Sequence, residues 1–310
     1  MILWLRVIYT RRVFLGTAAT AGIGTLRGAI SGMYVALNSS LTGGKAPWPD
    51  FVRLAGAAGY GGCDLNLGAA MKEGVPATRA AYAAAKVRPS FCSLPVTATR
   101  DEALFQTGLA GLEEAARFAA AVECPRMMAV MPAASATPKA EFRKILYDRF
   151  TAIGEVLGKH GVRLGLEFLG PLHFRTAAPH VFIYQLAEMV EFASECGGNV
   201  GVVLDDWHWH HAGGSVADIV AAGKERIVLV HLSDCAKLAP EEVRDNQRLL
   251  AGEGVIDLAG FFGALKKIGY EGSVSPEPIG RIPKEASAAE GAKLGLDSAL
   301  AVMRKAGIAV

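Results

Sequence analysis

Two neighbouring segments decide the fold class: Val200-Gly201-Val202-Val203-Leu204-Asp205 and Ile227-Val228-Leu229-Val230-His231. Each is a short apolar run rich in β-branched residues, and each ends in a polar side chain. Continuous apolar runs of this length indicate strands that are covered on both faces, as in a parallel sheet. A longer helix-like segment, residues 181–196, precedes the first run. This alternation of buried strand and helix predicts an α/β protein.

The same pattern extends in both directions along the chain. Strands are expected at 33–38, 62–66, 88–94, 126–132, 162–169, 200–206, 227–233 and 272–277, with helices including 101–122, 138–160, 181–196 and 257–268. Successive strands are about 34 residues apart, which fits a single (β/α)8 TIM barrel of about 250 residues. An open doubly wound sheet is the alternative, but no GxGxxG or GxxxxGK[ST] loop follows any strand. We therefore predict one barrel domain over residues 32–310.

The composition limits the class of protein. The chain has 310 residues, 51% of them hydrophobic and 20% charged, with a formal net charge of +2 and a mean hydropathy of +0.28. So much apolar surface excludes a disordered protein. The near-balance of charge argues against a nucleic-acid binder. Five cysteines without a CxxC leave at least one thiol outside any intrachain bridge.

The first 31 residues read as a leader segment rather than as part of the barrel. Thr10-Arg11-Arg12-Val13-Phe14-Leu15 resembles a twin-arginine export signal and predicts a periplasmic protein. The apolar run at 13–26 is too short for a stable membrane span. The alternative is a frayed terminus of a cytoplasmic protein. The five cysteines favour this alternative weakly, because an oxidising compartment usually favours paired cysteines.

Four successive strands each end in a side chain that can bind a metal: Glu167, Asp205, His231 and Glu277. In a barrel the carboxyl ends of the strands meet at one rim, so these side chains are expected to converge. Three carboxylates and one imidazole suit one divalent ion such as Mn²⁺, Mg²⁺ or Co²⁺, with Zn²⁺ a further candidate.

Each of these residues also has a plainer explanation. Asp205 could cap a following turn, Glu277 could lie in an exposed turn between two prolines, and His231 could hydrogen-bond Asp234. A polar residue that closes one strand is usually a cap or a solvated loop residue. Its recurrence on four consecutive strands favours a metal site.

At these residues the chain resembles the sugar phosphate isomerase/epimerase family of xylose-isomerase-like barrels. The segments that carry the resemblance are Gly165-Leu166-Glu167, Val203-Leu204-Asp205-Asp206-Trp207-His208, Val230-His231-Leu232-Ser233-Asp234, Gly252-Glu253-Gly254-Val255-Ile256-Asp257 and Pro276-Glu277-Pro278. The resemblance implies that Glu167, Asp205, His231 and Glu277 bind one divalent metal ion, and that Glu167 and Glu277 are also catalytic.

The resemblance also implies substrate-binding residues. It assigns His208, from the Asp-x-x-His spacing, and Arg248, four residues before a Gly-x-Gly, with Arg244 as a rival. His173 occupies a position where some epimerases have an acid, and is either a substrate contact or a surface residue. Trp207 and Trp209 either line a sugar pocket or pack in the interior, and His210 and His211 are expected at the rim.

The resemblance implies a metal-dependent isomerase or epimerase of a ketose or related keto-sugar, in which one glutamate removes the proton beside the carbonyl group and the other returns it. The alternatives are a lyase or dehydratase acting on a keto-cyclitol or keto-sugar, a non-catalytic sugar-binding barrel, and an abasic-site endonuclease. The last would need histidines on early strands and an Asp-x-His after His231, which the sequence lacks. A small carbohydrate is the expected partner, and a homo-oligomer is compatible with the sequence.

Overall fold

Parallel pairing joins all the strands of the central sheet, in the order β3-β2-β1-β11-β10-β9-β7-β5-β4. The computed structural model describes residues 32–310. The strands are β1 (Tyr34–Leu37), β2 (Gly62–Cys63), β3 (Arg88–Pro89), β4 (Cys92–Ser93), β5 (Arg126–Val130), β7 (Arg163–Glu167), β9 (Val200–Asp205), β10 (Ile227–Leu232) and β11 (Ser273–Pro276). The predicted leader at 1–31 lies outside the described residues.

The sheet closes into a barrel through the segment that contains β3 and β4. β3 pairs with β2, whereas β4, which begins after only Ser90 and Phe91, pairs with β5 on the other side. The single strand expected at 88–94 is therefore wrong in detail. Ser90 donates its N–H to Cys63 O and the Phe91 carbonyl accepts the Leu65 N–H, so the chain stays bonded to the β2 side through Phe91 and changes partner at Cys92. Since one continuous run bonds both neighbours, the ends of the strand order meet and form the predicted TIM barrel.

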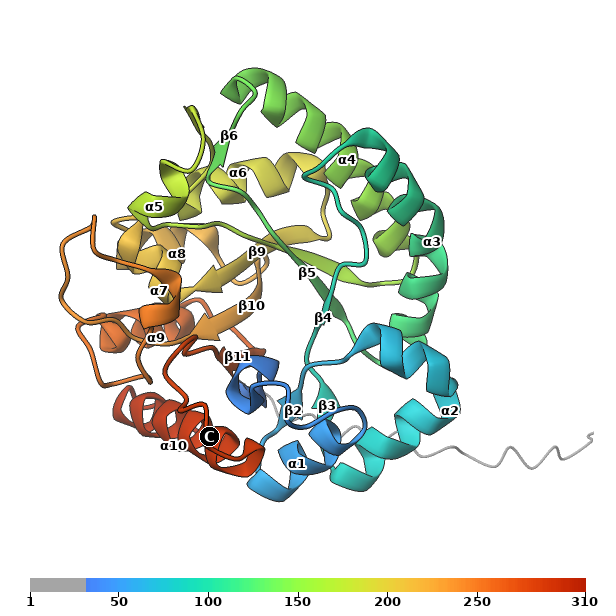
Figure 1. Ribbon diagram of the computed structural model, residues 1–310, viewed down its shortest axis with the longest axis vertical. Coiled ribbons are helices and arrows are strands. Elements are labelled where there is room, and N and C mark those ends of the chain that lie inside the picture. The colour runs from blue at the N-terminus through green and yellow to red at the C-terminus, as the bar shows by residue number, and fades with distance from the viewer. Residues whose placement is uncertain (1–31) are drawn as a thin grey trace, which may run out of the picture. The chain divides into compact units, whose positions relative to one another are not determined.

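Helices follow the strands and surround them (Figure 1). The longer ones are α1 (Asp50–Ala58), α2 (Leu67–Ala85), α3 (Glu102–Ala121), α4 (Lys139–Lys159), α6 (Leu186–Cys196), α8 (Val216–Ala222), α9 (Leu258–Lys267) and α10 (Ala288–Lys305). Three of the four helices expected from the sequence agree with α3, α4 and α9 to within one residue at each end. In the described residues, no helix is both long and apolar enough to cross a membrane.

Several short elements lie at the carboxyl rim of the barrel. They are η1 (Ser39–Thr42), α5 (Leu172–Arg175), α7 (Asp206–His211), η2 (Asp245–Gln247) and an antiparallel pair of β6 (Ala134–Ser135) and β8 (His180–Val181). The helix expected at 181–196 begins only at Leu186, because Val181 pairs with Ala134 in this small sheet.

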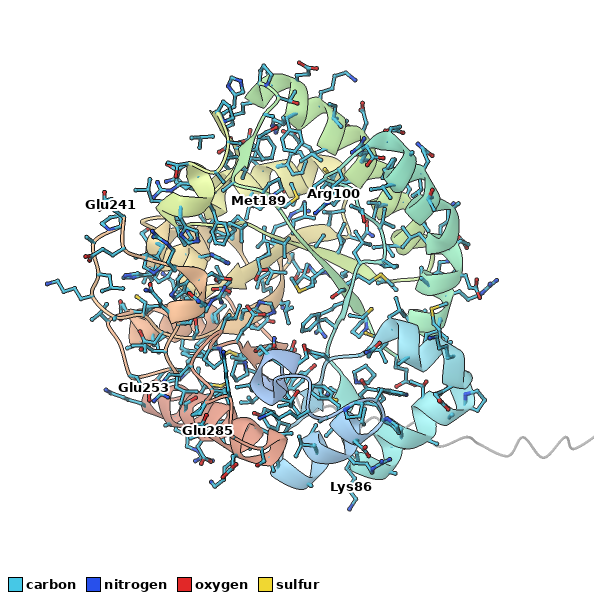
Figure 2. All side chains as sticks on the ribbon, viewed as in Figure 1. Lys86, Arg100, Met189, Glu241, Glu253 and Glu285 are labelled. Carbon is cyan, nitrogen blue, oxygen red and sulfur yellow. The ribbon has the colours of Figure 1, made fainter. Side chains whose placement is uncertain are left out.

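Alternation along the strands separates the barrel interior from its outer wall. Val203 and Leu229 pack with Phe91 in a small cluster of their own, apart from the main core shared with the helices. Figure 2 shows side chains filling the space between the strands and the surrounding helices. Successive strand residues point to opposite faces, so Asp205 and His231 face the interior, two positions beyond Val203 and Leu229. The apolar cluster thus forms a floor beneath the polar strand ends.

Candidate metal centre and active site

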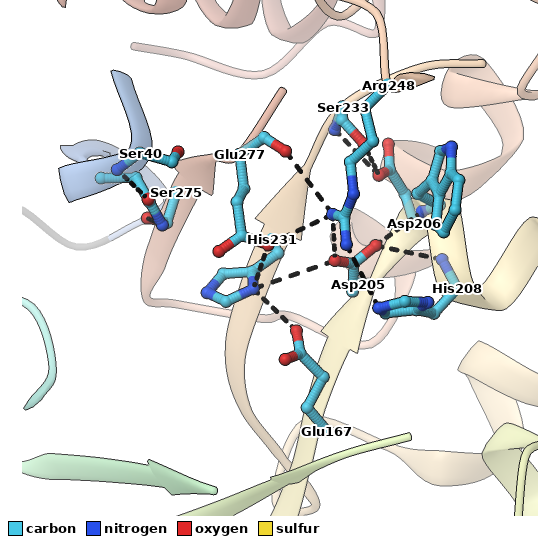
Figure 3. Close-up of polar contacts among 12 residues, drawn as sticks. Ser40, Glu167, Asp205, Asp206, His208, His231, Ser233, Arg248, Ser275 and Glu277 are labelled. Carbon is cyan, nitrogen blue, oxygen red and sulfur yellow. Dashed lines mark hydrogen bonds and ion pairs between the residues drawn. The ribbon is translucent and has the colours of Figure 1, made fainter. Parts of the chain in front are cut away.

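The four side chains predicted to bind metal meet at the carboxyl rim of the barrel. Glu167 ends β7, Asp205 ends β9, His231 lies near the end of β10, and Glu277 directly follows β11. One ligand atom from each lies within 4.8 Å of those of the others. Figure 3 shows the four side chains pointing toward one another. The barrel therefore brings together residues that are separated by up to 110 positions in the chain.

His231 lies at the centre of this group. Its Nδ1 is 2.8 Å from Glu167 Oε1, 3.4 Å from Glu277 Oε2 and 3.9 Å from Asp205 Oδ2. The explanation of His231 as a partner of Asp234 is wrong, because the Asp234 carboxylate accepts main-chain N–H groups from the loop that follows β10.

Arg248 forms a second layer behind the carboxylates. Its Nη1 donates to Asp205 Oδ2 at 2.7 Å and to Glu277 Oε2 at 3.2 Å. The guanidinium lies over the Trp207 ring, 4.7 Å from its centroid, and Asp245 Oδ1 accepts from Nε and Nη2. With only 3% of its surface exposed, Arg248 is held rigidly and fixes the orientation of two predicted ligands.

His208 and Asp205 are linked through the short helix α7. Asp205 Oδ1 caps this helix by accepting the N–H groups of Trp207 at 2.8 Å and His208 at 3.1 Å. Asp205 therefore caps a helix, as the alternative explanation expected, and also belongs to the cluster of four predicted ligands. Burial lowers the pKa of His208 to about 4. The neutral ring accepts a hydrogen bond at Nε2 from Arg248 Nη2, at 3.2 Å.

The electrostatics of the cluster suit a cation. Burial raises the pKa of Glu167 to about 7, although His231 opposes the shift. Burial lowers the pKa of His231, but the adjacent Glu277 and Glu167 carboxylates more than offset this, so that pKa lies well above its usual value. Burial also raises the pKa of Asp205, and Arg248 with the two histidines brings it below the usual value. Asp205 and Glu277 pair with Arg248, whereas Glu167 pairs only with His231, so among the described residues Arg248 is the one permanent cation within 4.0 Å of the three carboxylates. An oxygen-rich donor set of this kind fits a divalent ion.

A cavity of about 1080 Å³ opens beside the cluster, and Glu167 and Glu277 form part of its wall. Other polar wall residues include Asn38, Asp64, Asn66, Ser93 and Thr107, and the larger apolar ones include Trp48, Phe51, Met71, Phe91 and Met128. A mostly apolar hollow with a few convergent polar groups is typical of a small-molecule site. The cavity gives an organic substrate room next to both glutamates.

The remaining predicted residues lie outside this cavity wall. His173, on α5, is half-buried against Phe174, with ring centroids 4.1 Å apart, and its role as a substrate contact stays a prediction. Arg244 turns to the carbonyl groups of Glu241 and Val243, so Arg248 rather than its rival joins the cluster. Trp207 and Trp209 are buried packing residues, and His210 and His211 are half-buried along another hollow.

The sequence prediction missed three acidic residues that surround the cluster. Asp245 holds Arg248, and Asp206 accepts the Ser233 N–H at 2.9 Å, while Asp64 lies in the cavity wall. Asp64 directly follows β2, but the strand was expected at 62–66, so Asp64 lay inside the expected run and the strand-end rule did not select it. Asp245 lies in a long loop, where no periodic pattern marks it.

Comparison with known proteins agrees with this geometry. The sequence matches the family described as Xylose isomerase-like TIM barrel over residues 51–298. The chain belongs to this family. A solved member, the xylose isomerase domain protein of Alicyclobacillus acidocaldarius, superposes with a TM-score of 0.81 at 26% identity, over 89% of this chain and 99% of that one.

Curated relatives of this xylose isomerase-like barrel are enzymes. The chain is 28% identical over 211 residues to inosose isomerase of Halalkalibacterium halodurans, covering 66% of this chain and 71% of the relative. It is 29% identical to inosose isomerase of Bacillus subtilis over 45% of this chain, and spans about half of that relative, 48%. It is 30% identical to 3-dehydroshikimate dehydratase of Pseudomonas putida over 43% of this chain and 20% of the relative.

Proposed function

We propose that this protein is a divalent-metal-dependent isomerase or epimerase of a ketose or related keto-sugar, including keto-cyclitols. The observation that carries the proposal is the convergence of Glu167, Asp205, His231 and Glu277 beside a cavity that two of these carboxylates line. The inosose isomerase relatives support the reaction class.

The four side chains would hold the ion, which could be Mn²⁺, Mg²⁺, Co²⁺ or Zn²⁺. Such an ion supplies positive charge that stabilises negative charge developing on adjacent carbonyl and hydroxyl oxygens of the substrate. Arg248 fixes the Asp205 and Glu277 carboxylates through Nη1, so that both are oriented before a ligand arrives.

Proton transfer falls to the two glutamates that reach the cavity. Glu167 extends from β7 and Glu277 from the segment after β11, and each lies beside His231 Nδ1. One carboxylate would remove the proton next to the carbonyl group, and the other would return a proton to the substrate. The apolar wall would limit the access of water to the reacting carbon.

Deuterium incorporation from solvent into candidate keto-sugars, followed by NMR, tests this proposal. The wild-type protein with Mn²⁺ should exchange the proton beside the carbonyl of at least one ketose or inosose. Glu167→Gln and Glu277→Gln should each reduce the rate by about 10²- to 10⁴-fold, because each removes a proton-transfer group. Their circular dichroism spectra should match the wild type. Undiminished exchange in either variant would contradict the two-glutamate reaction.

A metal-dependent dehydratase is the second candidate, favoured by the relationship to 3-dehydroshikimate dehydratase. It begins with the same proton abstraction and then loses hydroxide. The same NMR experiment separates the two, since a dehydratase yields an unsaturated product, whereas an isomerase yields a rearranged, saturated one.

A further inference from the structure

Asp64 is a carboxylate in the cavity wall that the proposed reaction does not use. It follows β2, and its main chain is held on both sides, because its N–H donates to Leu37 O at 3.1 Å and its carbonyl accepts from the Tyr82 hydroxyl at 3.0 Å. Its Oδ2 accepts the Ser39 N–H at 2.9 Å. The position of the Asp64 carboxylate is therefore set by the barrel and not by a substrate.

This carboxylate keeps most of its acceptor capacity free. An ionised carboxylate has about four lone-pair sites, and in the structure Asp64 Oδ1 is buried without a hydrogen-bond partner. In residues 32–310, no Lys, Arg or His lies within ion-pair distance of Asp64. Burial raises the pKa of Asp64 to about 7, opposed by the Ser39 N–H and His231 and assisted by Glu277. A shielded acceptor without donors costs free energy until a ligand donates to it.

The charge of the cavity wall gives the class of ligand. Its charged members among the described residues are Asp64, Glu167 and Glu277, and none of them is basic. With a divalent ion bound, the three positive charges of the ion and Arg248 face four carboxylates, Glu167, Asp205, Glu277 and Asp245, so the cluster keeps no positive excess. Ionised Asp64 then leaves the cavity with an excess of negative charge, which repels phosphate and carboxylate groups and attracts hydroxyl donors.

We propose that Asp64 is a substrate-binding residue that selects an uncharged, polyhydroxylated substrate. It accepts a hydrogen bond from a substrate hydroxyl group and makes the cavity disfavour phosphorylated and carboxylated analogues. This inference rests on the proposed function for the presence of a sugar in the cavity. It goes beyond that function because it specifies the charge of the substrate and the residue that selects for it.

Ligand binding tests the inference separately from turnover. Saturation-transfer NMR measures the dissociation constants of D-fructose, D-tagatose, D-psicose and 2-keto-myo-inositol, and of D-fructose 6-phosphate as the charged probe, on protein with Mg²⁺. The variants are Asp64→Asn, which still accepts the Ser39 N–H, and Glu114→Gln, which removes one exposed negative charge elsewhere. At least one uncharged probe should bind the wild type about tenfold or more tightly than the phosphate ester does.

In Asp64→Asn the favoured uncharged probe should bind about tenfold more weakly, and the discrimination against the phosphate ester should shrink by a similar factor. Glu114→Gln should match the wild type. Equal binding in wild type and Asp64→Asn, tighter binding of the phosphate ester, or no binding of any uncharged probe would overturn the inference. Normal binding without deuterium exchange would refute the proposed reaction alone, whereas normal exchange with unchanged selectivity in Asp64→Asn would refute this inference alone.

Discussion

Arg248 shows at the scale of one residue how much of the site depends on a single charge. It bonds Asp205, Glu277, Asp245 and His208 and lies over Trp207. Removal of the only cation beside a buried carboxylate destabilises the folded protein strongly, whereas the intact ion pair contributes little net stability. Arg248 is therefore a positioning residue whose removal affects folding as well as activity.

We expect Arg248→Gln to lower the free energy of unfolding by about 3 to 5 kcal/mol in the presence of a chelator, because the Asp205 and Glu277 carboxylates lose their cationic partner. The free energy of unfolding of Arg248→Lys should lie between those of Arg248→Gln and the wild type, since an ammonium group keeps the positive charge but cannot reproduce the planar guanidinium. Urea unfolding monitored by fluorescence measures both. Arg244→Gln, in the same loop as Arg248 but outside the cluster, is the matched control. A stability loss no larger than that of the control would contradict this role.

The sequence predicted single residues well where they close an apolar strand. Glu167, Asp205, His231 and Glu277 each follow such a run, and the barrel brings them together as expected. Asp64 follows a strand of only two residues, Gly62–Cys63, so its signal was weak. Asp245 could not be predicted, because its position depends on how the loop after β10 folds over Arg248.

At the scale of elements, α7 connects the metal cluster to the loop after β7. Gly170 lies against the turn of α7 that carries His208 and Ala212. A Cβ atom at Gly170 would lie 2.0 Å from the His208 carbonyl oxygen and 2.9 Å from the Ala212 nitrogen. Main-chain atoms cannot move aside as flexible side chains do, so the whole helix would have to shift.

Gly170→Ala should reduce deuterium exchange by about tenfold to a hundredfold, because a displacement of about 1 Å at a positioned group costs that much. It should also cost about 1 to 3 kcal/mol of stability through overpacking. NMR exchange rates and urea unfolding measure the two effects. Gly263→Ala, at an exposed glycine of α9 outside the cavity wall with no atom within 4 Å of the added carbon, is the control. Wild-type activity in Gly170→Ala would show that α7 does not position the site.

Elements were predicted where a local pattern determines them, and missed where tertiary pairing does. The periodic helices α3, α4 and α9 were predicted almost to the residue. The division of the third strand into β3 and β4 depends on bonding two different neighbours. The late start of α6 depends on the pairing of Val181 with Ala134 across 47 positions of the chain. Neither pairing leaves a periodic trace in its own segment.

At the scale of the described barrel, the site concentrates negative charge in one place. The overall composition is nearly balanced, with 32 basic and 30 acidic residues, yet the rim gathers three carboxylates around one imidazole. Such crowding opposes folding until a cation balances it. The stability of the folded barrel should therefore respond to a divalent ion.

Adding Mn²⁺ to chelator-treated protein should raise Tm, because an ion that binds only the folded state stabilises it by about 2.7 kcal/mol at a hundredfold excess over Kd. For a domain of this size that is roughly 5 °C. Differential scanning calorimetry measures the shift, and His231→Asn, which removes one ligand, should show a much smaller one. Glu253→Gln, in an exposed pair with Arg281 away from the cluster, should respond like the wild type. Equal shifts in His231→Asn and wild type would place the ion elsewhere, and no shift with Mn²⁺, Mg²⁺, Co²⁺ or Zn²⁺ would refute the metal centre.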